Sequence, residues 1–249
     1  MSKLEVRQIH LSFGNIHVLN GISFTVHDGE FVSLLGPSGS GKSTLFSIIG
    51  GIRRPDRGSI WLNGKNITGK TGLISYTPQT PSLMPWRTII DNVLLGQEIQ
   101  GYRDEKAALA MIDRAGLKGY ENSYPHELSG GMKQRVAFIR SLLSPQSIIC
   151  LDEPFSALDE LTRMDMQNWL LSIWSEHQKS VLFVTHNIEE ALFLSDRILV
   201  LSEKPARITA EFHVPFPRPR KEMLYLTDEF IHIKREIYHV LRGQLVKHS

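Results

Sequence analysis

One octapeptide restricts the possible folds of this chain more than any other feature. Residues 36–43 read Gly-Pro-Ser-Gly-Ser-Gly-Lys-Ser and match the pattern G-x-x-x-x-G-K-[ST]. The mostly apolar run 31–35 directly precedes this octapeptide, and a helical pattern starts at Ser43. A strand buried on both faces, a glycine-rich turn and a helix in this order predict a loop whose backbone N–H groups converge on the phosphates of a nucleotide.

Each residue type in this loop has a chemical task. The ammonium group of Lys42 neutralises β- and γ-phosphate oxygens, and the hydroxyl of Ser43 can bind Mg²⁺. The N-terminus of the following helix adds partial positive charge. The residues predicted to contact the nucleotide are Gly36, Pro37, Ser38, Gly39, Ser40, Gly41, Lys42, Ser43 and Thr44.

A magnesium-dependent phosphate site also needs a carboxylate at the end of a neighbouring strand. The run 147–151 is typical of a buried strand, and Asp152 and Glu153 follow it directly. We expect Asp152 to reach Mg²⁺ and Glu153 to polarise a water molecule that faces the γ-phosphate. These elements predict a Mg²⁺-dependent nucleoside triphosphatase or a kinase and do not separate the two. Cys150 is expected to be a small apolar core residue.

The rest of the chain predicts an α/β architecture. Apolar runs recur at 181–184 and 197–201 with helical stretches between them, which indicates a mostly parallel sheet. The first thirty residues instead alternate apolar and polar side chains in short β-branched runs, so we expect an N-terminal antiparallel β subdomain there. Helical spacing from about 87 to 143 predicts an inserted α-helical subdomain.

The predicted domain spans the whole chain, 1–249, and ends in a C-terminal extension from about residue 205. A stretch rich in proline and arginine opens this extension and is interpreted as an extended surface connector. A helix is predicted after it, over residues 227–241.

The balance of charge limits the partners of the chain. The sequence has 28 Lys and Arg against 26 Asp and Glu, a formal net charge of +2, so no strong field favours nucleic acid or anionic lipid. The first six residues lack the apolar region of a signal peptide, and no apolar run approaches the roughly 18 residues that a membrane span needs. We therefore expect a chain of the reducing cytosol, without signal peptide or transmembrane segment.

A second glycine-containing motif separates the classes of nucleotide-binding protein. Residues 128–135 read Leu-Ser-Gly-Gly-Met-Lys-Gln-Arg, and a helix is predicted after the two glycines, from Met132. A serine and two glycines at a helix N-terminus form a second anion site of backbone amides and a hydroxyl. Placed between the phosphate loop and Asp152, this stretch resembles the signature motif of ATP-binding-cassette (ABC) proteins.

Four further elements stand in the order of that family, and the resemblance covers roughly residues 3 to 203. Phe13 resembles the aromatic residue that stacks on adenine, Gln79 the glutamine of the Q-loop, residues 156–159 the D-loop, and His186 the switch histidine.

The sequence departs from the family pattern at three places. Phe13 stands where many relatives have tyrosine, so stacking is kept and a hydroxyl contact is lost. Thr77 and Pro78 replace a Val-Phe pair before Gln79, and the proline restricts the backbone that enters this loop. Met132 replaces the commoner glutamine after the signature motif. The second departure puts the flexibility of the Q-loop in question.

The resemblance implies a homodimer in which each ATP lies between the phosphate loop of one subunit and the signature motif of the other. The resemblance implies that the catalytic residues are Glu153, His186, Gln79 and Lys42. It also implies that Ser43, Gln79 and Asp152 bind the magnesium ion, and that Ser129, Gly130 and Gly131 of the partner subunit close the site.

Residues 83–86, which read Leu-Met-Pro-Trp, and residues 161–167 resemble the importer branch for nitrate, sulfonates, taurine and pyrimidine precursors of thiamine. That branch implies a multi-span permease on separate chains, an extracytoplasmic solute-binding protein that selects the solute, and a peripheral location at the cytoplasmic face of the membrane. Exposed Leu, Met and Trp suit a groove for a permease helix, with ordinary packing between two lobes as the alternative. A non-transport ABC ATPase acting on nucleic acid or a soluble partner is the alternative function.

Overall fold

The structure is a computed structural model that describes residues 2–177 and 179–245. These residues divide into two compact units, one from Met1–Ile74 and Gln178–Ser249 and the other from Ser75–His177. Among the described residues, none of the helices is both long and apolar enough to cross a membrane.

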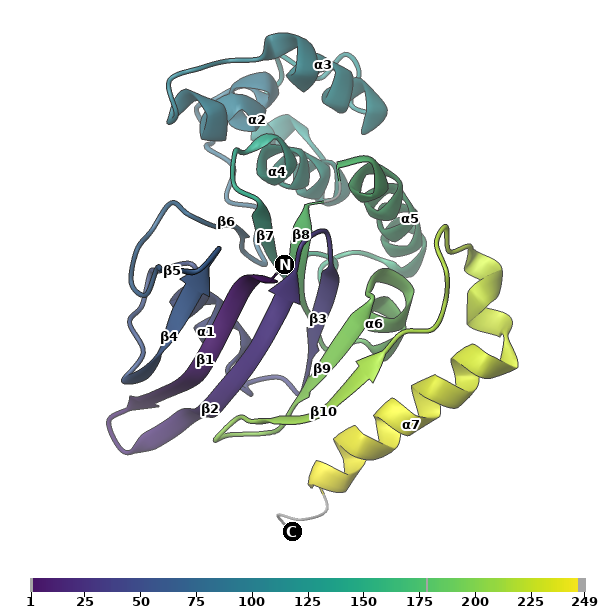
Figure 1. The fold of residues 1–249 in the computed structure, drawn as a ribbon. Helices are drawn as coiled ribbons and strands as arrows, with labels where there is room; N and C mark the ends of the chain where they lie inside the picture. Colours follow the sequence, from purple (N-terminus) through teal and green to yellow (C-terminus); the bar gives the residue numbers. More distant parts are fainter. Residues whose placement is uncertain (1, 178, 246–249) are drawn as a thin grey trace. The chain divides into compact units, whose positions relative to one another are not determined.

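The N-terminal part of the first unit is an antiparallel sheet in the order β2-β1-β4-β5. Its strands are β1 (Ser2–Phe13), β2 (Ile16–His27), β4 (Arg57–Leu62) and β5 (Lys65–Asn66). Strand β1 lies between β2 and β4 (Figure 1). Val6 of β1 pairs with Phe24 of β2 and with Ile60 of β4, and all three side chains are buried. Exposed and buried positions alternate along the second half of β2, as the sequence pattern predicts. The expectation of half-exposed antiparallel strands is confirmed.

A second group of strands in this unit carries the buried core. Strand β3 (Phe31–Leu35) pairs in parallel with β8 (Ser180–Thr185) and with β9 (Arg197–Leu201), and β10 (Ile208–His213) adds to β9 in the antiparallel direction. Every residue of β3, β8 and β9 is buried, which explains why these strands read as continuous apolar runs. The expectation of parallel strands at these positions is confirmed.

Helices α1 (Lys42–Ile49), α6 (Ile188–Leu194) and α7 (Asp228–Leu245) and a short 3-10 turn, η2 (Glu222–Leu226), complete the first unit. Helix α7 extends past the predicted end at residue 241. Phe230 and Ile237 of α7 pack in one buried cluster with Ala191 and Leu192 of α6. The C-terminal extension therefore packs on the core through an apolar face.

The interpretation of the Pro/Arg stretch as an extended surface connector holds only in part, because Pro215, Pro217 and Pro219 are exposed but two other side chains of the stretch are buried. Phe216 is buried in the cluster beneath α7, and Arg220 is only 8% exposed. The Arg220 guanidinium donates hydrogen bonds to the carbonyl oxygens of Leu192, Phe193 and Ser195 at 2.8–3.1 Å, at the C-terminus of α6. Carbonyl groups at a helix end lack partners within the helix, so a guanidinium is a fitting cap. The connector thus caps the C-terminus of α6 through the Arg220 side chain.

The second unit combines two strands, four α-helices and one 3-10 turn. Strand β6 (Ser75–Thr77) pairs in parallel with β7 (Ile148–Asp152), which is buried along its whole length. The predicted helical segment contains α2 (Ile89–Glu98), α3 (Glu105–Arg114), the 3-10 turn η1 (Pro125–Glu127) and α4 (Gly130–Leu143), and α5 (Glu160–His177) follows β7. Phe138 of α4 meets Trp169 of α5 edge to face, with ring centroids 5.4 Å apart.

Candidate nucleotide-binding site

The glycine-rich loop between β3 and α1 is packed tightly on one side and open on the other. Gly41 has a φ of 106°, and a Cβ added to it would lie 2.9 Å from Cγ1 of Val18, which excludes any side chain. Gly39 has a φ of 77°, but a Cβ on it would meet no atom within 4 Å. The loop therefore rests against β2 and leaves open space above Gly39.

Two polar side chains of this loop are buried. Nζ of Lys42 donates to the carbonyl oxygens of Gly36 and Pro37, each at 2.8 Å. The hydroxyl of Ser40 is buried and has no hydrogen-bond partner among the residues that the structure describes. A buried hydroxyl without a partner costs about 1–3 kcal/mol. Helix α1 has no acidic side chain in its first turn, so its partial positive charge remains uncompensated there. The loop fits a bound anion that accepts hydrogen bonds.

Phe13, at the end of β1, is exposed and carries a cation on one face of its ring. The guanidinium carbon of Arg53 lies 4.7 Å from the ring centroid. A stacked base would therefore take the opposite face of Phe13 or replace Arg53.

His186 directly follows β8 and is exposed. The backbone N–H of Asn187 donates to Oγ1 of Thr185 at 3.0 Å, so the residues on either side of His186 are hydrogen-bonded to each other. This hydrogen bond restrains the backbone at His186.

In the second unit, Asp152 is buried at the end of β7, as the sequence predicts for a carboxylate at a strand end. The hydroxyl of Tyr76 donates to Oδ2 of Asp152 at 3.1 Å. Burial and the neighbouring Asp152 raise the pKa of Tyr76, so the phenol stays protonated and keeps donating. Burial also raises the pKa of Cys150, which behaves as the inert core residue that was expected.

Glu153 has a φ of 44°, a left-handed conformation that is rare for a residue with a side chain. Its carbonyl oxygen accepts hydrogen bonds from Oγ and from the backbone N–H of Ser156, at 2.9 and 3.2 Å. Nε2 of Gln79 donates to the same Ser156 hydroxyl at 3.1 Å, and Nε2 of Gln134 donates to the carbonyl oxygen of Gln79 at 3.2 Å. Ser156 thus connects Glu153 to Gln79. Strained backbone of this kind is concentrated at functional sites.

The signature motif opens α4, which begins at Gly130 instead of Met132. Oγ of Ser129 accepts a hydrogen bond from the Met132 backbone N–H at 3.3 Å and caps the helix. A Cβ added to Gly130 would meet nothing within 4 Å, whereas one on Gly131 would lie 3.2 Å from Cγ2 of Thr162. The first glycine therefore keeps the helix N-terminus accessible, and the second permits close packing against α5.

The predicted site residues are distributed over both units. Phe13, the phosphate loop and His186 belong to the first unit, and Gln79, the signature motif, Asp152 and Glu153 to the second. Within the second unit, Gln79 and Glu153 are brought together through Ser156.

The roles of Tyr76 and Gln134 were not predicted from the sequence. The Tyr76 contact depends on the pairing of β6 with β7, where Tyr76 lies opposite Cys150. No local signal marks that register. Gln134 stands inside the quoted signature stretch, where its position on α4 was the only available hint.

Comparison with known proteins supports the resemblance. The sequence profile of the ABC transporter family matches residues 19–156. An uncharacterized ABC transporter ATP-binding protein of Methanocaldococcus jannaschii is 40% identical over 252 residues, covering 98% of this chain and 93% of the relative. A formylaminopyrimidine import ATP-binding protein of Halalkalibacterium halodurans is 44% identical over 83% of this chain and 81% of its own. An aliphatic sulfonates import ATP-binding protein of Pseudomonas syringae pv. syringae is 42% identical over 88% of this chain and 89% of its own.

Solved structures give the same result. A dimeric ATP-binding cassette in a post-hydrolysis state with ADP and phosphate matches with a TM-score of 0.73 and 30% identity, over 86% of this chain and 100% of the other. An ABC transporter cassette in its ADP conformation matches with a TM-score of 0.75 and 25% identity, over 96% and 98% of the two chains. The predicted α/β cassette fold is confirmed. This chain therefore belongs to the ABC transporter family, as an ATP-binding subunit.

Proposed function

We propose that this chain hydrolyses ATP to energise the uptake of a small solute through a separate membrane permease. The observation that carries the nucleotide part is the phosphate loop, where the buried Ser40 hydroxyl has no partner among the described residues and Gly39 faces open space. A phosphate oxygen would supply the missing acceptor. The names of two relatives, which import formylaminopyrimidine and aliphatic sulfonates, support the transport part.

The proposed roles of the residues follow from their chemistry. Lys42 and the backbone of residues 36–44 bind the phosphates, and Phe13 stacks on the base. Mg²⁺ prefers oxygen ligands, and the side chains of Ser43, Gln79 and Asp152 offer them. A magnesium ion that is bound together with a nucleotide typically needs only one or two carboxylates from the protein. The ion would neutralise charge on the phosphates.

Glu153 is the proposed general base. It follows Asp152 directly, and its strained backbone is held by Ser156. A carboxylate of this kind orients and polarises the attacking water, while His186 contacts the γ-phosphate. Hydrolysis then relies on positioning and electrostatic stabilisation, without a covalent intermediate.

The proposed active form is a homodimer with ATP at its interface. Ser129, Gly130 and Gly131 would bind the phosphates held by the other subunit, which is supported by the uncovered N-terminus of α4 at Gly130. A structural relative at 30% identity is described as dimeric. Dimerisation would then depend on nucleotide.

The proposed contact surface for the permease lies around Trp86, whose side chain is 72% exposed. The buried Asn92 holds the backbone of this segment, because its amide donates to the carbonyl oxygens of Met84 and Arg87, both at 3.1 Å. The fixed backbone keeps an exposed indole facing outward, as a docking surface for an apolar helix requires.

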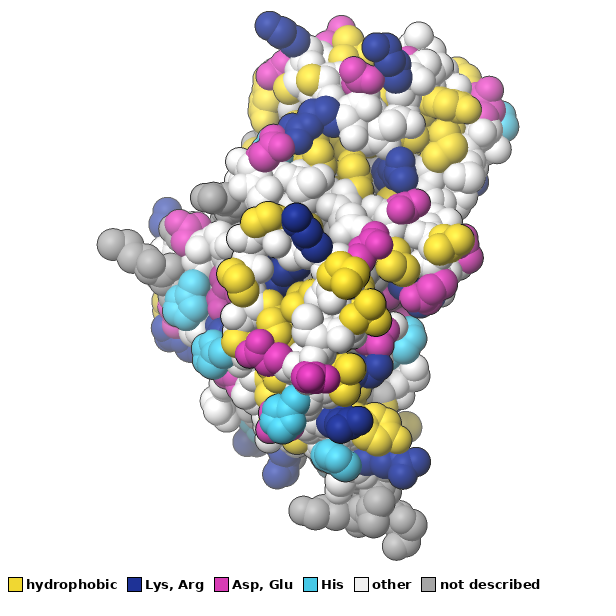
Figure 2. Space-filling model, turned by 90° about the vertical axis from the view of Figure 1, so that its right-hand side faces the viewer, with side chains coloured by type: hydrophobic (Ala, Val, Ile, Leu, Met, Phe, Trp, Pro, Cys, Tyr) yellow, Lys and Arg dark blue, Asp and Glu magenta, His cyan; other side chains and the backbone are white. Residues whose placement is uncertain are grey.

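The proposed solute is nitrate, a sulfonate such as taurine, or a hydroxymethylpyrimidine-like molecule, selected by an extracytoplasmic binding protein. The chain would sit at the cytoplasmic face of the membrane. A role on nucleic acid is disfavoured by the near balance of charge and by the mixing of acidic and basic side chains on the face in Figure 2.

The test is a pull-down of tagged Glu153→Gln from gently solubilised native membranes with MgATP, followed by mass spectrometry. We expect a multi-span chain to be recovered. Trp86→Glu in the same background is the matched control, and it should keep ATP binding while losing the multi-span chain. Recovery of only soluble or nucleic-acid-bound partners would contradict the transport function.

A further inference from the structure

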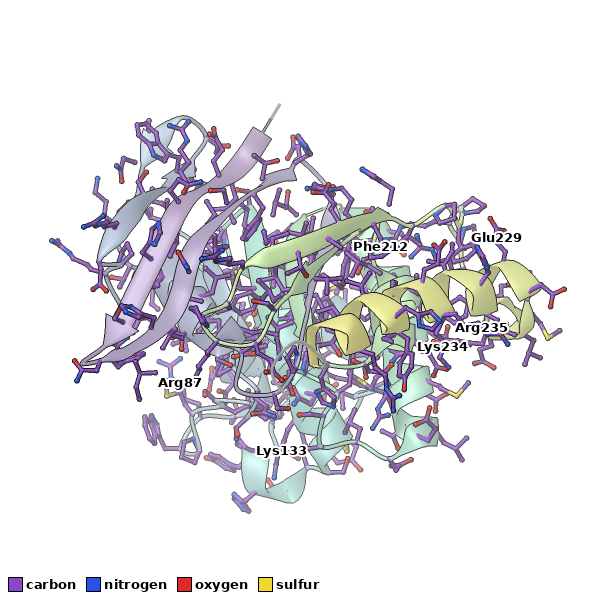
Figure 3. The ribbon with its side chains drawn as sticks, turned by 90° about the horizontal axis from the view of Figure 1, so that it is seen from below. Arg87, Lys133, Phe212, Glu229, Lys234 and Arg235 are labelled. Carbon is purple, nitrogen blue, oxygen red and sulfur yellow. The ribbon has the colours of Figure 1, made fainter. Side chains whose placement is uncertain are left out.

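Helix α7 packs on α6, the helix that begins two residues after His186. Phe230 and Ile237 of α7 share a buried cluster with Ala191 and Leu192 of α6. Figure 1 shows α7 as the long helix at the end of the coloured chain, and Figure 3 shows it with Lys234 and Arg235 labelled. The C-terminal extension is thus in direct contact with the segment that carries the proposed switch histidine.

An ion pair joins the two helices at the His186 end of α6. Nζ of Lys234 contacts Oε1 of Glu189, and both side chains are partly exposed. Glu189 lies in the first turn of α6. The neighbouring Arg235 is exposed and has no ion pair with any residue that the structure describes. Lys234 therefore has a partner that Arg235 lacks, although both belong to the same turn of α7.

Hydrogen bonds connect this first turn of α6 to the backbone around His186. Oδ1 of Asn187 accepts from the backbone N–H groups of Glu189 at 2.8 Å and Glu190 at 3.3 Å. Oγ1 of Thr185 accepts from the Asn187 N–H at 3.0 Å and donates to Oε2 of Glu190 at 2.5 Å. Both neighbours of His186 are thereby bonded to the start of α6, so a displacement of α6 displaces His186 as well.

An open groove of about 560 Å³ lies beside this ion pair and is lined by residues of both helices. His186 and Glu189 border it on one side, and Lys234, Tyr238 and Arg242 of α7 border it on the other. Near His186, this ion pair adds to the packing of Ile188 on the apolar cluster that α6 shares with α7.

We propose that α7 sets the position of His186, and that Lys234 is a positioning residue for ATP hydrolysis. The inference rests on the proposed contact of His186 with the γ-phosphate. Lys234 holds the side chain of Glu189, Asn187 holds the backbone of Glu189, and Asn187 and Thr185 flank His186. Loss of this chain of contacts lowers the rate of hydrolysis and leaves nucleotide affinity nearly unchanged, because the phosphate loop is not part of it.

The test is Lys234→Glu, which places two carboxylates opposite each other, with Arg235→Glu as the matched control for the change of charge on α7. We expect Lys234→Glu to lower kcat by up to about fivefold, because an exposed pair contributes no more than about 1 kcal/mol. The KM for ATP should match that of Arg235→Glu. Adding Glu189→Lys to Lys234→Glu restores opposite charges and should restore kcat.

The same substitution is then made in His186→Ala. If Lys234 acts through His186, Lys234→Glu causes no further loss in that background. An equal loss in both backgrounds, or a kcat for Lys234→Glu equal to that of Arg235→Glu, would overturn the inference alone. A His186→Ala protein with the rate of the unsubstituted protein would overturn the proposed role of His186 and this inference with it.

Discussion

The phenol of Tyr76 donates a hydrogen bond of 3.1 Å to the carboxylate of Asp152, and burial holds its pKa above the ordinary value. This contact orients the carboxylate that is proposed to bind Mg²⁺. Groups that orient a metal ligand typically change metal affinity by about 10–100-fold when removed.

Tyr76→Phe is therefore expected to raise the Mg²⁺ concentration for half-maximal ATP hydrolysis by about tenfold. The maximal rate at saturating Mg²⁺ should change much less, because Asp152 itself remains. Tyr102→Phe is the matched control, since Tyr102 is exposed. Identical Mg²⁺ titrations for the two variants would show that Tyr76 does not influence Mg²⁺ binding.

Ser40→Ala should affect the free protein and the nucleotide complex in opposite directions. Removal of a buried hydroxyl without a partner is expected to stabilise the nucleotide-free protein by about 1 kcal/mol. Nucleotide affinity should fall by about tenfold because a hydrogen bond to a charged phosphate is lost. Chemical denaturation and isothermal titration measure the two effects. The exposed Ser38→Ala is the control for stability, and a loss of stability in Ser40→Ala would show that the hydroxyl has a structural partner.

Arg220→Met should destabilise the protein by about 2–3 kcal/mol, because hydrogen bonds from a charged group to buried carbonyl oxygens are lost. Arg220→Lys should not restore stability, since one ammonium cannot reproduce the planar fork that reaches Leu192, Phe193 and Ser195. Burial lowers the pKa of Arg220 to about 10, so the guanidinium remains charged at neutral pH. Urea unfolding of Arg220→Met is compared with that of Lys221→Met, a substitution at an exposed residue. Equal unfolding midpoints for these two variants would contradict a stabilising role of the Arg220 hydrogen bonds.

Lys179 makes stability depend on pH. Burial lowers its pKa from 10.5 to about 8. Between these two values the unfolded chain binds more protons than the folded chain, so stability rises with pH from about 8 to about 10.5 and is lowest below pH 8. Lys179→Met should flatten this rise in denaturation experiments, whereas the exposed Lys106→Met should keep it. The same slope in both variants would exclude Lys179 as its source.

The sequence predicted those parts of the fold that depend on local patterns. Strands β3 and β9 match the apolar runs 31–35 and 197–201 residue for residue, because strands buried on both faces admit few polar side chains. The phosphate loop and the cap of α4 were also predictable, since glycine and serine act there on their own backbone.

The long-range contacts were not predictable in this way. The burial of Arg220 depends on carbonyl groups of α6, which lie more than twenty residues earlier in the chain. Proline and arginine are mostly exposed in folded proteins, so a stretch of them predicts a surface segment unless the buried α6 carbonyl groups are known. The departure at Thr77 has a similar explanation, because its buried hydroxyl bonds Oγ of Ser141 at 2.6 Å, a pairing that valine could not make.

ATP hydrolysis with Glu153 as the base can be tested by phosphate release and ATP binding measured in the same samples. We expect Glu153→Gln to bind MgATP as tightly as the unsubstituted protein and to release phosphate about 10²–10⁴-fold more slowly, the usual contribution of a general base. A Glu153→Gln protein that turns over ATP at the normal rate would contradict the role of Glu153 as the general base.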